Sequence, residues 1–151
     1  MTTLDEHSGI ARRLLKQLEA FVDEVGRRSS TSHLESVTTD GMYLRGGKLG
    51  QKPERFVEDH LIYPVLSTLG HSFRPQPIQY APKWPKDRGI PDFALTTVSP
   101  ETAKELDIRL FGEAKTPNKL QYARTEVREY LQKDTDFDAI AILTDGIEWE
   151  L

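Results

Sequence analysis

The spacing of the hydrophobic residues changes near residue 70, and this change limits the folds open to the chain. Residues 4–28 and 53–69 carry apolar side chains at helical spacing, and so do residues 120–133. The strand-like segments are residues 73–80, 92–98, 107–115, 139–143 and 147–151. The order helix, helix, two or three strands, helix, strand, strand predicts a mixed α/β sandwich around one central sheet.

Local signals refine these elements. Pro53 suits the first position of a helix, and Pro64 inside that helix should kink or split it. Pro75 and Pro77 make the first strand an edge strand or an irregular segment. Residues 92–98 and 107–115 are expected to form an antiparallel pair, with a turn over residues 99–105. The continuous apolar run 139–143 is typical of a strand that is covered on both faces.

Residues 29–51 are rich in Ser, Thr and Gly and are expected to form a loop, with a short strand near residues 42–44. The chain of 151 residues is expected to comprise an N-terminal helix and linker, residues 1–52, and a core, residues 53–151. Because its last apparent strand reaches the final residue, a longer parent protein is expected.

Composition excludes several classes of protein. With no cysteine, the chain has no disulfide, thiolate metal site or cysteine nucleophile. Its apolar runs are shorter than the ~18 residues of a membrane span, and its first residues do not resemble a signal peptide, so a cytoplasmic protein is expected. A formal net charge of −4 counts modestly against nucleic-acid binding, although the position of the charges matters more than their sum.

Three ionisable residues carry the predicted chemistry. Asp92 begins one strand of the antiparallel pair and Glu113 lies near the end of the other, so their carboxylates can be neighbours. Two adjacent carboxylates repel unless a cation lies between them, and oxygen ligands select Mg²⁺ or Mn²⁺. Lys115 shares a strand face with Glu113, and the backbone carbonyl of Ala114 could add a ligand. Taken alone, the bare pattern would favour a solvated hairpin whose charges face water.

Four segments together resemble the PD-(D/E)XK nuclease superfamily. These are PERFVEDHLIYPVLSTLG, GIPDFAL, LFGEAK and ILTDGIEWEL. The nearest resemblance is to nuclease domains of restriction–modification systems, such as the N-terminal region of type I restriction motor subunits. It implies a restriction-endonuclease-like central mixed sheet flanked by helices, here with an extra N-terminal helix. It also implies Mg²⁺- or Mn²⁺-dependent cleavage of DNA, with Asp92, Glu113 and Lys115 as the motif residues.

The family often places one more acid on the helix before the sheet. Glu58 is the expected residue, and Glu54 one turn away remains an alternative. Related restriction nucleases often carry a glutamine a few residues before a tyrosine on the helix after the lysine. Here Glu126 precedes Tyr130 at that spacing, so the role of the glutamine is not carried over.

Two functions from different classes remain open. The first is a metal-dependent endonuclease domain that works in host defence with further domains or subunits. The second is a catalytically silent module of the same fold that binds DNA or a partner protein. A basic segment before Asp92 could contact a phosphate backbone or could be a solvated loop; its residues are Lys83, Trp84, Lys86 and Arg88.

Overall fold

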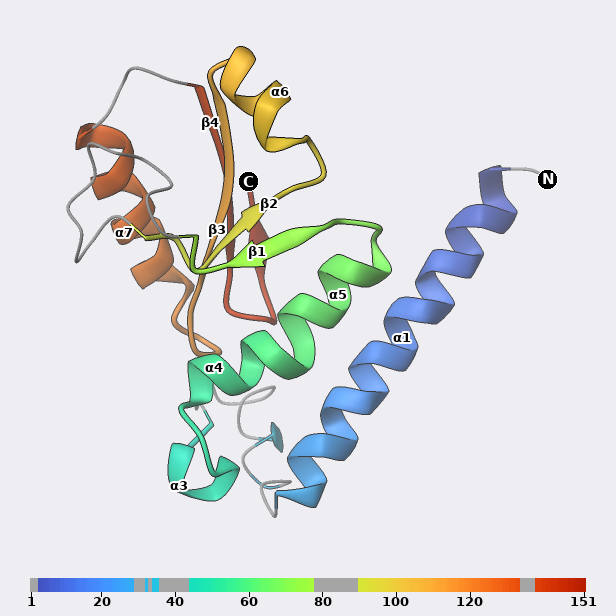
Figure 1. Ribbon diagram of the computed structural model, residues 1–151. Coiled ribbons are helices and arrows are strands. Elements are labelled where there is room, and N and C mark those ends of the chain that lie inside the picture. The colour runs from blue at the N-terminus through green and yellow to red at the C-terminus, as the bar shows by residue number, and fades with distance from the viewer. Residues whose placement is uncertain (1–2, 29–31, 33, 36–43, 78–89, 134–137) are drawn as a thin grey trace. The chain divides into compact units, whose positions relative to one another are not determined.

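The helical and strand-like segments of the sequence form helices and strands in the computed structural model (Figure 1). The structure describes residues 3–28, 32, 34–35, 44–77, 90–133 and 138–151. Helices dominate the first unit, which comprises Met1–Gly70 and Thr116–Asn118. The second unit comprises His71–Lys115 and Lys119–Leu151 and holds the sheet. The boundary expected between residues 52 and 53 falls within the first unit and stays a prediction.

The first unit contains the long N-terminal helix that the apolar stripe predicts. Helix α1 spans Thr3–Arg27 and packs against the later helices of this unit. Phe21 and Val25 are buried there, and the Phe21 ring lies 5.8 Å from that of Phe56 between centroids. Three other members of the stripe are exposed, namely Leu15, Leu18 and Val22. The helix is therefore confirmed, but only part of its expected apolar face is buried.

Two more segments of the first unit are helical. Within the expected loop, Gly46–Leu49 forms the short helix α3, which Gly50 closes in the left-handed region with φ 73°. The strand expected near residues 42–44 lies largely outside the described residues. The second predicted helix is confirmed as α4 (Pro53–Val57), the π-helical turn η1 (Glu58–Ile62) and α5 (Tyr63–Thr68).

The π turn marks where Pro64 interrupts the helix. Proline has no N–H and its ring crowds the carbonyl four residues earlier, so a regular α-helix cannot pass through this position. The turn before it widens instead, and the N–H of Tyr63 donates to the carbonyl of Glu58. The predicted break therefore takes the form of a π turn rather than two separate helices.

The second unit is built on a five-stranded mixed sheet. Its strands are β1 (Phe73–Pro75), β2 (Phe93–Leu95), β3 (Ile108–Ala114), β4 (Asp138–Thr144) and β5 (Trp149–Glu150). They lie in the order β1-β2-β3-β4-β5, and among these neighbours only β3 and β4 are parallel. The predicted antiparallel pair of β2 and β3 is confirmed. The chain thus has a mixed α/β architecture.

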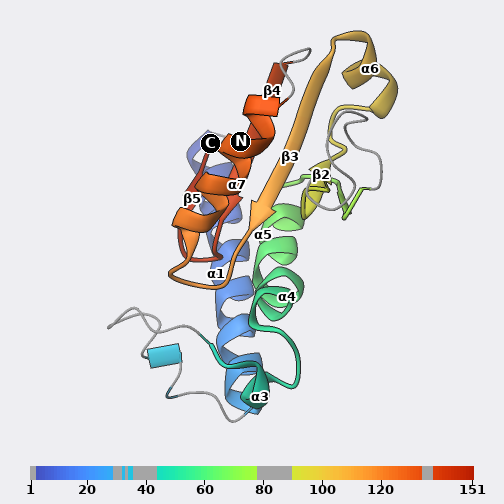
Figure 2. The ribbon, with the colours of Figure 1, turned by 90° about the vertical axis from the view of Figure 1, so that its left-hand side faces the viewer.

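Helix α7, Leu120–Lys133, packs on one face of this sheet against β3 and β4 (Figure 2). The buried cluster between them consists of Phe111, Leu120, Ala123, Val127, Tyr130 and Leu143. The helix was predicted over the same residues. Strand β4 is covered less than predicted, because Ile140 remains 53% exposed while Leu143 is buried.

The turn expected over residues 99–105 is wrong, because Pro100–Glu105 forms helix α6. Ser99 caps it: its Oγ accepts the N–H of Thr102 at 3.1 Å. Pro100 then stands at the first helical position, where a missing N–H has no cost. Serine and proline are frequent in turns as well, which explains why the segment was predicted as one.

Candidate active site

The register of β2 and β3 brings the two motif acids together. Phe93 lies opposite Gly112 in this antiparallel pair. One position further along, the same register sets Asp92 opposite Glu113. Directly opposite residues share a face of the sheet, so both carboxylates lie on the same face. The predicted proximity of Asp92 and Glu113 is therefore a consequence of strand pairing.

Close packing next to the acids fixes this register. The Phe93 ring covers Gly112, and a Cβ at position 112 would overlap the ring atoms. Phe93 is fully buried. Only glycine leaves room for the end of the Phe93 ring at this position, so the pair anchors the short strand β2 against β3.

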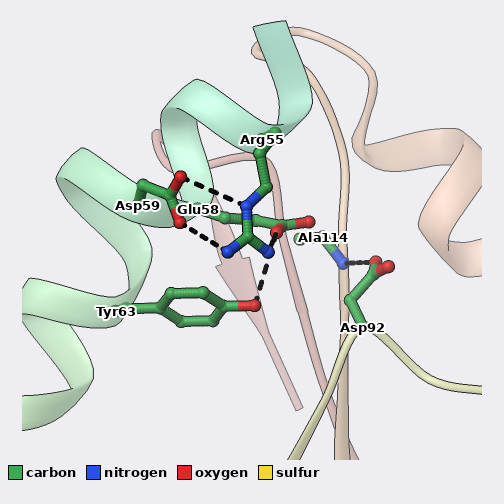
Figure 3. A network of polar contacts seen from close by, with 6 residues as sticks. All are labelled: Arg55, Glu58, Asp59, Tyr63, Asp92 and Ala114. Atoms are coloured by element: carbon green, nitrogen blue, oxygen red, sulfur yellow. Dashed lines mark hydrogen bonds and ion pairs between the residues drawn. The ribbon is translucent and has the colours of Figure 1, made fainter. Parts of the chain in front are cut away.

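Backbone hydrogen bonds orient Asp92. Its Oδ2 accepts the N–H of Ala114 at 2.7 Å (Figure 3). Its own carbonyl accepts the N–H of Gln76 at 2.8 Å, which ties the residue to the end of β1. The N–H and C=O of one strand residue point to the same edge, so the Ala114 carbonyl also faces the Asp92 side of β3. The use of that carbonyl as a metal ligand stays a prediction.

Glu113 and Lys115 project from one face of β3, as their spacing predicts. The Lys115 Nζ lies 2.6 Å from Oε1 of Glu113. Glu113 is only 2% exposed. Its other oxygen, Oε2, is buried and has no hydrogen-bond donor among the described residues. A buried polar oxygen without a partner is costly, and a cation could satisfy it.

Glu126 on α7 is a fourth member of the site that sequence reasoning did not assign. Its Oε2 lies 2.9 Å from Nζ of Lys115. The sequence did contain a signal for it. Glu126 lies three residues after Ala123 and four before Tyr130, both buried against the sheet, so an acid interrupts the inward stripe of the helix.

The acidic groups perturb one another. Burial and the nearby carboxyls of Glu126 and Asp92 together raise the pKa of Glu113 to about 10, although the Lys115 ammonium acts in the opposite direction. Burial also raises the pKa of Asp92, which the hydrogen bond from Ala114 offsets only in part. The neighbouring Glu113 carboxyl and the Lys115 ammonium lower the pKa of Glu126.

Lys115 remains an ammonium ion. Burial acts against its charge, but the attraction of Glu113 and the hydrogen bonds to Glu113 and Glu126 outweigh that effect and raise the pKa of Lys115. Lys115 can therefore donate hydrogen bonds at neutral pH but cannot accept a proton.

Glu58, the expected helix acid, belongs to the first unit. It is 4% exposed and lies in the π turn. Its Oε2 accepts a hydrogen bond from Nη1 of Arg55 at 3.0 Å and another from the hydroxyl of Tyr63 at 3.3 Å (Figure 3). The Arg55 guanidinium also pairs with Asp59 at 2.9 Å. Within the first unit, Glu58 thus accepts hydrogen bonds from Arg55 and Tyr63. Its role as a metal ligand stays a prediction, as does the alternative of Glu54.

The second unit offers a donor set that fits a hard divalent cation. Asp92 and Glu113 supply carboxylate oxygens on adjacent strands, and the Ala114 carbonyl adds a neutral oxygen. Glu113, with a pKa of about 10, holds a proton at neutral pH, and the pKa of Asp92 is raised as well. A cation would replace the proton on Glu113, so cation binding should release that proton and strengthen with pH.

The basic segment with Lys83, Trp84, Lys86 and Arg88 lies outside the described residues. Among the described helices, none is long and apolar enough to cross a membrane. Comparisons of the chain with family models, curated proteins and solved structures gave no match.

Proposed function

We propose that Asp92, Glu113 and Lys115 belong to the active site of a metal-dependent nuclease of the PD-(D/E)XK kind, acting on DNA. The observation that supports this most is the convergence of Asp92, Glu113 and Lys115 from two paired strands. Independent charges on a solvated hairpin would face water. Here Glu113 is buried, and one of its oxygens lacks a donor among the described residues.

Asp92, Glu113 and the Ala114 carbonyl are the proposed ligands for Mg²⁺ or Mn²⁺, and Glu58 is the proposed additional one. When bound, the cation would neutralise charge on a phosphate and lower the pKa of an attached water. The hydrogen bond from Ala114 holds Asp92 in a fixed orientation. The strand pairing holds Glu113 opposite it before any ligand arrives.

Lys115 is proposed to hold the attacking water and to stabilise negative charge at the phosphate. Its raised pKa supports this role, because a permanent ammonium donates hydrogen bonds throughout the neutral range. The same property argues against Lys115 as the general base. The proton of the attacking water must therefore pass to another group, such as solvent or the phosphate itself.

The wider proposal follows from the resemblance of the sequence. It includes a restriction-endonuclease-like sheet, a cytoplasmic restriction or defence system, and further domains or subunits. The mixed sheet supports the fold part of this proposal, since both acids lie on its antiparallel strand pair β2 and β3, and α7 links the parallel strands β3 and β4. The net charge of −4 means that DNA contacts must come from local basic groups or from partners.

Cleavage assays test the proposal directly. Plasmid and linear DNA are incubated with the protein in Mg²⁺, Mn²⁺ or EDTA. Cleavage should require a divalent ion and disappear in Lys115→Ala, while Lys48→Ala, at an exposed lysine of the first unit, should leave it unchanged. Metal-dependent cleavage that persists in Lys115→Ala would refute the proposed site.

A catalytically silent module is the second candidate. Lys115 is engaged by both Glu113 and Glu126, and such an ion-paired cluster can serve structure alone. Calorimetric titration with Mn²⁺ separates the two. Metal binding that is lost in Asp92→Asn, without cleavage, would indicate a site that needs a missing partner. No binding and no cleavage would favour the silent module.

A further inference from the structure

The acid on α7 has a role that the motif residues do not provide. Among the described residues, the Lys115 ammonium is held at 2.6 Å by Glu113 and at 2.9 Å by Glu126. The side chain of Lys115 is 12% exposed, whereas that of Glu126 is 43% exposed. Glu126 is therefore the outer contact of the lysine, and Glu113 is the inner one.

We propose that Glu126 is a positioning residue, which keeps the ammonium of Lys115 in place when Glu113 is engaged with a cation. This inference rests on the proposed function, in which Glu113 is a metal ligand. Oxygens that bind a divalent ion attract an ammonium less, and the ion itself repels the ammonium. Without a second acceptor, Lys115 would swing toward solvent.

Glu126 lies on a helix that is held rigidly against the sheet. Helix α7 is fixed to the sheet by its buried residues Ala123, Val127 and Tyr130, which surround position 126 along the helix. The fixed base of Glu126 gives the ammonium a stable outer partner.

The competing role for Glu126 is that of a third carboxylate ligand. A ligand and a positioning residue differ in a measurable way. Removing a ligand weakens metal binding directly, whereas removing a positioning residue leaves metal binding intact and acts through Lys115. Mn²⁺ titration of Glu126→Gln should give the wild-type affinity within about threefold, as should Glu129→Gln at an exposed site on the same helix.

Kinetics provide the second test. Glu126→Ala should lower kcat by about 10- to 100-fold with little change in KM, because displacing a reacting group by an ångström has effects of that size. Glu126→Gln keeps an acceptor oxygen and should recover part of the loss. An unchanged kcat in Glu126→Ala would overturn the proposal, as would a tenfold loss of Mn²⁺ affinity in Glu126→Gln.

An activity-independent readout separates this inference from the nuclease proposal. The folded protein with saturating Mn²⁺ is treated with an amine-acetylating reagent, and the modification of each lysine is followed by mass spectrometry. Lys115 should be modified several-fold faster in Glu126→Ala than in wild type, while Lys48 should not change. This result without any DNA cleavage would retain the positioning role and leave the nuclease proposal to be tested with a missing partner. Equal modification rates would reject the positioning role, whatever the cleavage assays give.

Discussion

Replacing Glu113 with glutamine should stabilise the metal-free protein while abolishing metal binding. The buried carboxyl keeps its proton in the folded state up to a pKa of about 10, but it ionises near 4.5 in the unfolded chain. When the pKa of an acid is higher in the folded state, the folded state is fully favoured at pH values below the unfolded-state pKa. This stabilisation is lost as pH rises toward the folded-state pKa. Stability should therefore fall across the range from pH 4.5 to about 10.

The size of the effect follows from the difference between the pH of the measurement and the unfolded-state pKa of Glu113. Each unit corresponds to about 1.4 kcal/mol, so three units above the unfolded pKa give at most about 4 kcal/mol at pH 7.5. Glutamine resembles the protonated acid in shape and still offers an oxygen to Lys115, but it does not ionise on unfolding. Glu113→Gln should regain most of this free energy at pH 7.5 and almost none at pH 4.5.

Urea unfolding in EDTA, followed by tryptophan fluorescence, measures both proteins at several pH values. Glu129→Gln on the exposed side of α7 is the matched control and should behave as wild type. Mn²⁺ at a hundred times its dissociation constant should add about 2.7 kcal/mol to wild type and nothing to Glu113→Gln. The reasoning is refuted if Glu113→Gln is less stable than wild type at pH 7.5 without metal, or if wild-type stability does not change with pH.

Three further substitutions test other contacts. Gly112→Ala should lower the free energy of unfolding by about 1–3 kcal/mol or more because its methyl group meets the Phe93 ring, and Mn²⁺ affinity should fall with it; unchanged stability would contradict the packing. Ser99→Ala should cost about 1 kcal/mol through loss of the cap to Thr102, measured by thermal unfolding, while an equal melting temperature would mean that the cap contributes nothing. Glu58→Gln should weaken Mn²⁺ binding about tenfold or more in calorimetry if the predicted ligand role is correct, and an unchanged affinity would remove Glu58 from the site.

The sequence predicted the acidic pair and its lysine because local rules suffice there. Strand alternation places Glu113 and Lys115 on one face, and antiparallel pairing brings Asp92 to Glu113. The helices over residues 4–28 and 120–133 were predictable for the same reason, since a 3.6-residue period repeats over several turns.

Contacts between elements were harder to predict. Glu126 reaches Lys115 only because α7 packs on β3, and periodicity gives the inward face of a helix but not its partner. The burial of Phe93 against Gly112 depends on a register that no local pattern states. Helix α6 was missed because a serine followed by proline starts both turns and helices, and only the packing of the following residues decides between them.

The ring of Phe93 lying over Gly112 has a consequence for how such a chain can change over evolutionary time. Each of these positions adjoins one of the two acids, and neither can accept a new side chain without the other adapting. A larger residue at position 112 requires a smaller one at position 93, so a change that preserves stability must alter both positions together. Mutational drift beside Asp92 and Glu113 should therefore be slow even where no ligand touches the chain, and a paired library at 93 and 112 would reveal this dependence.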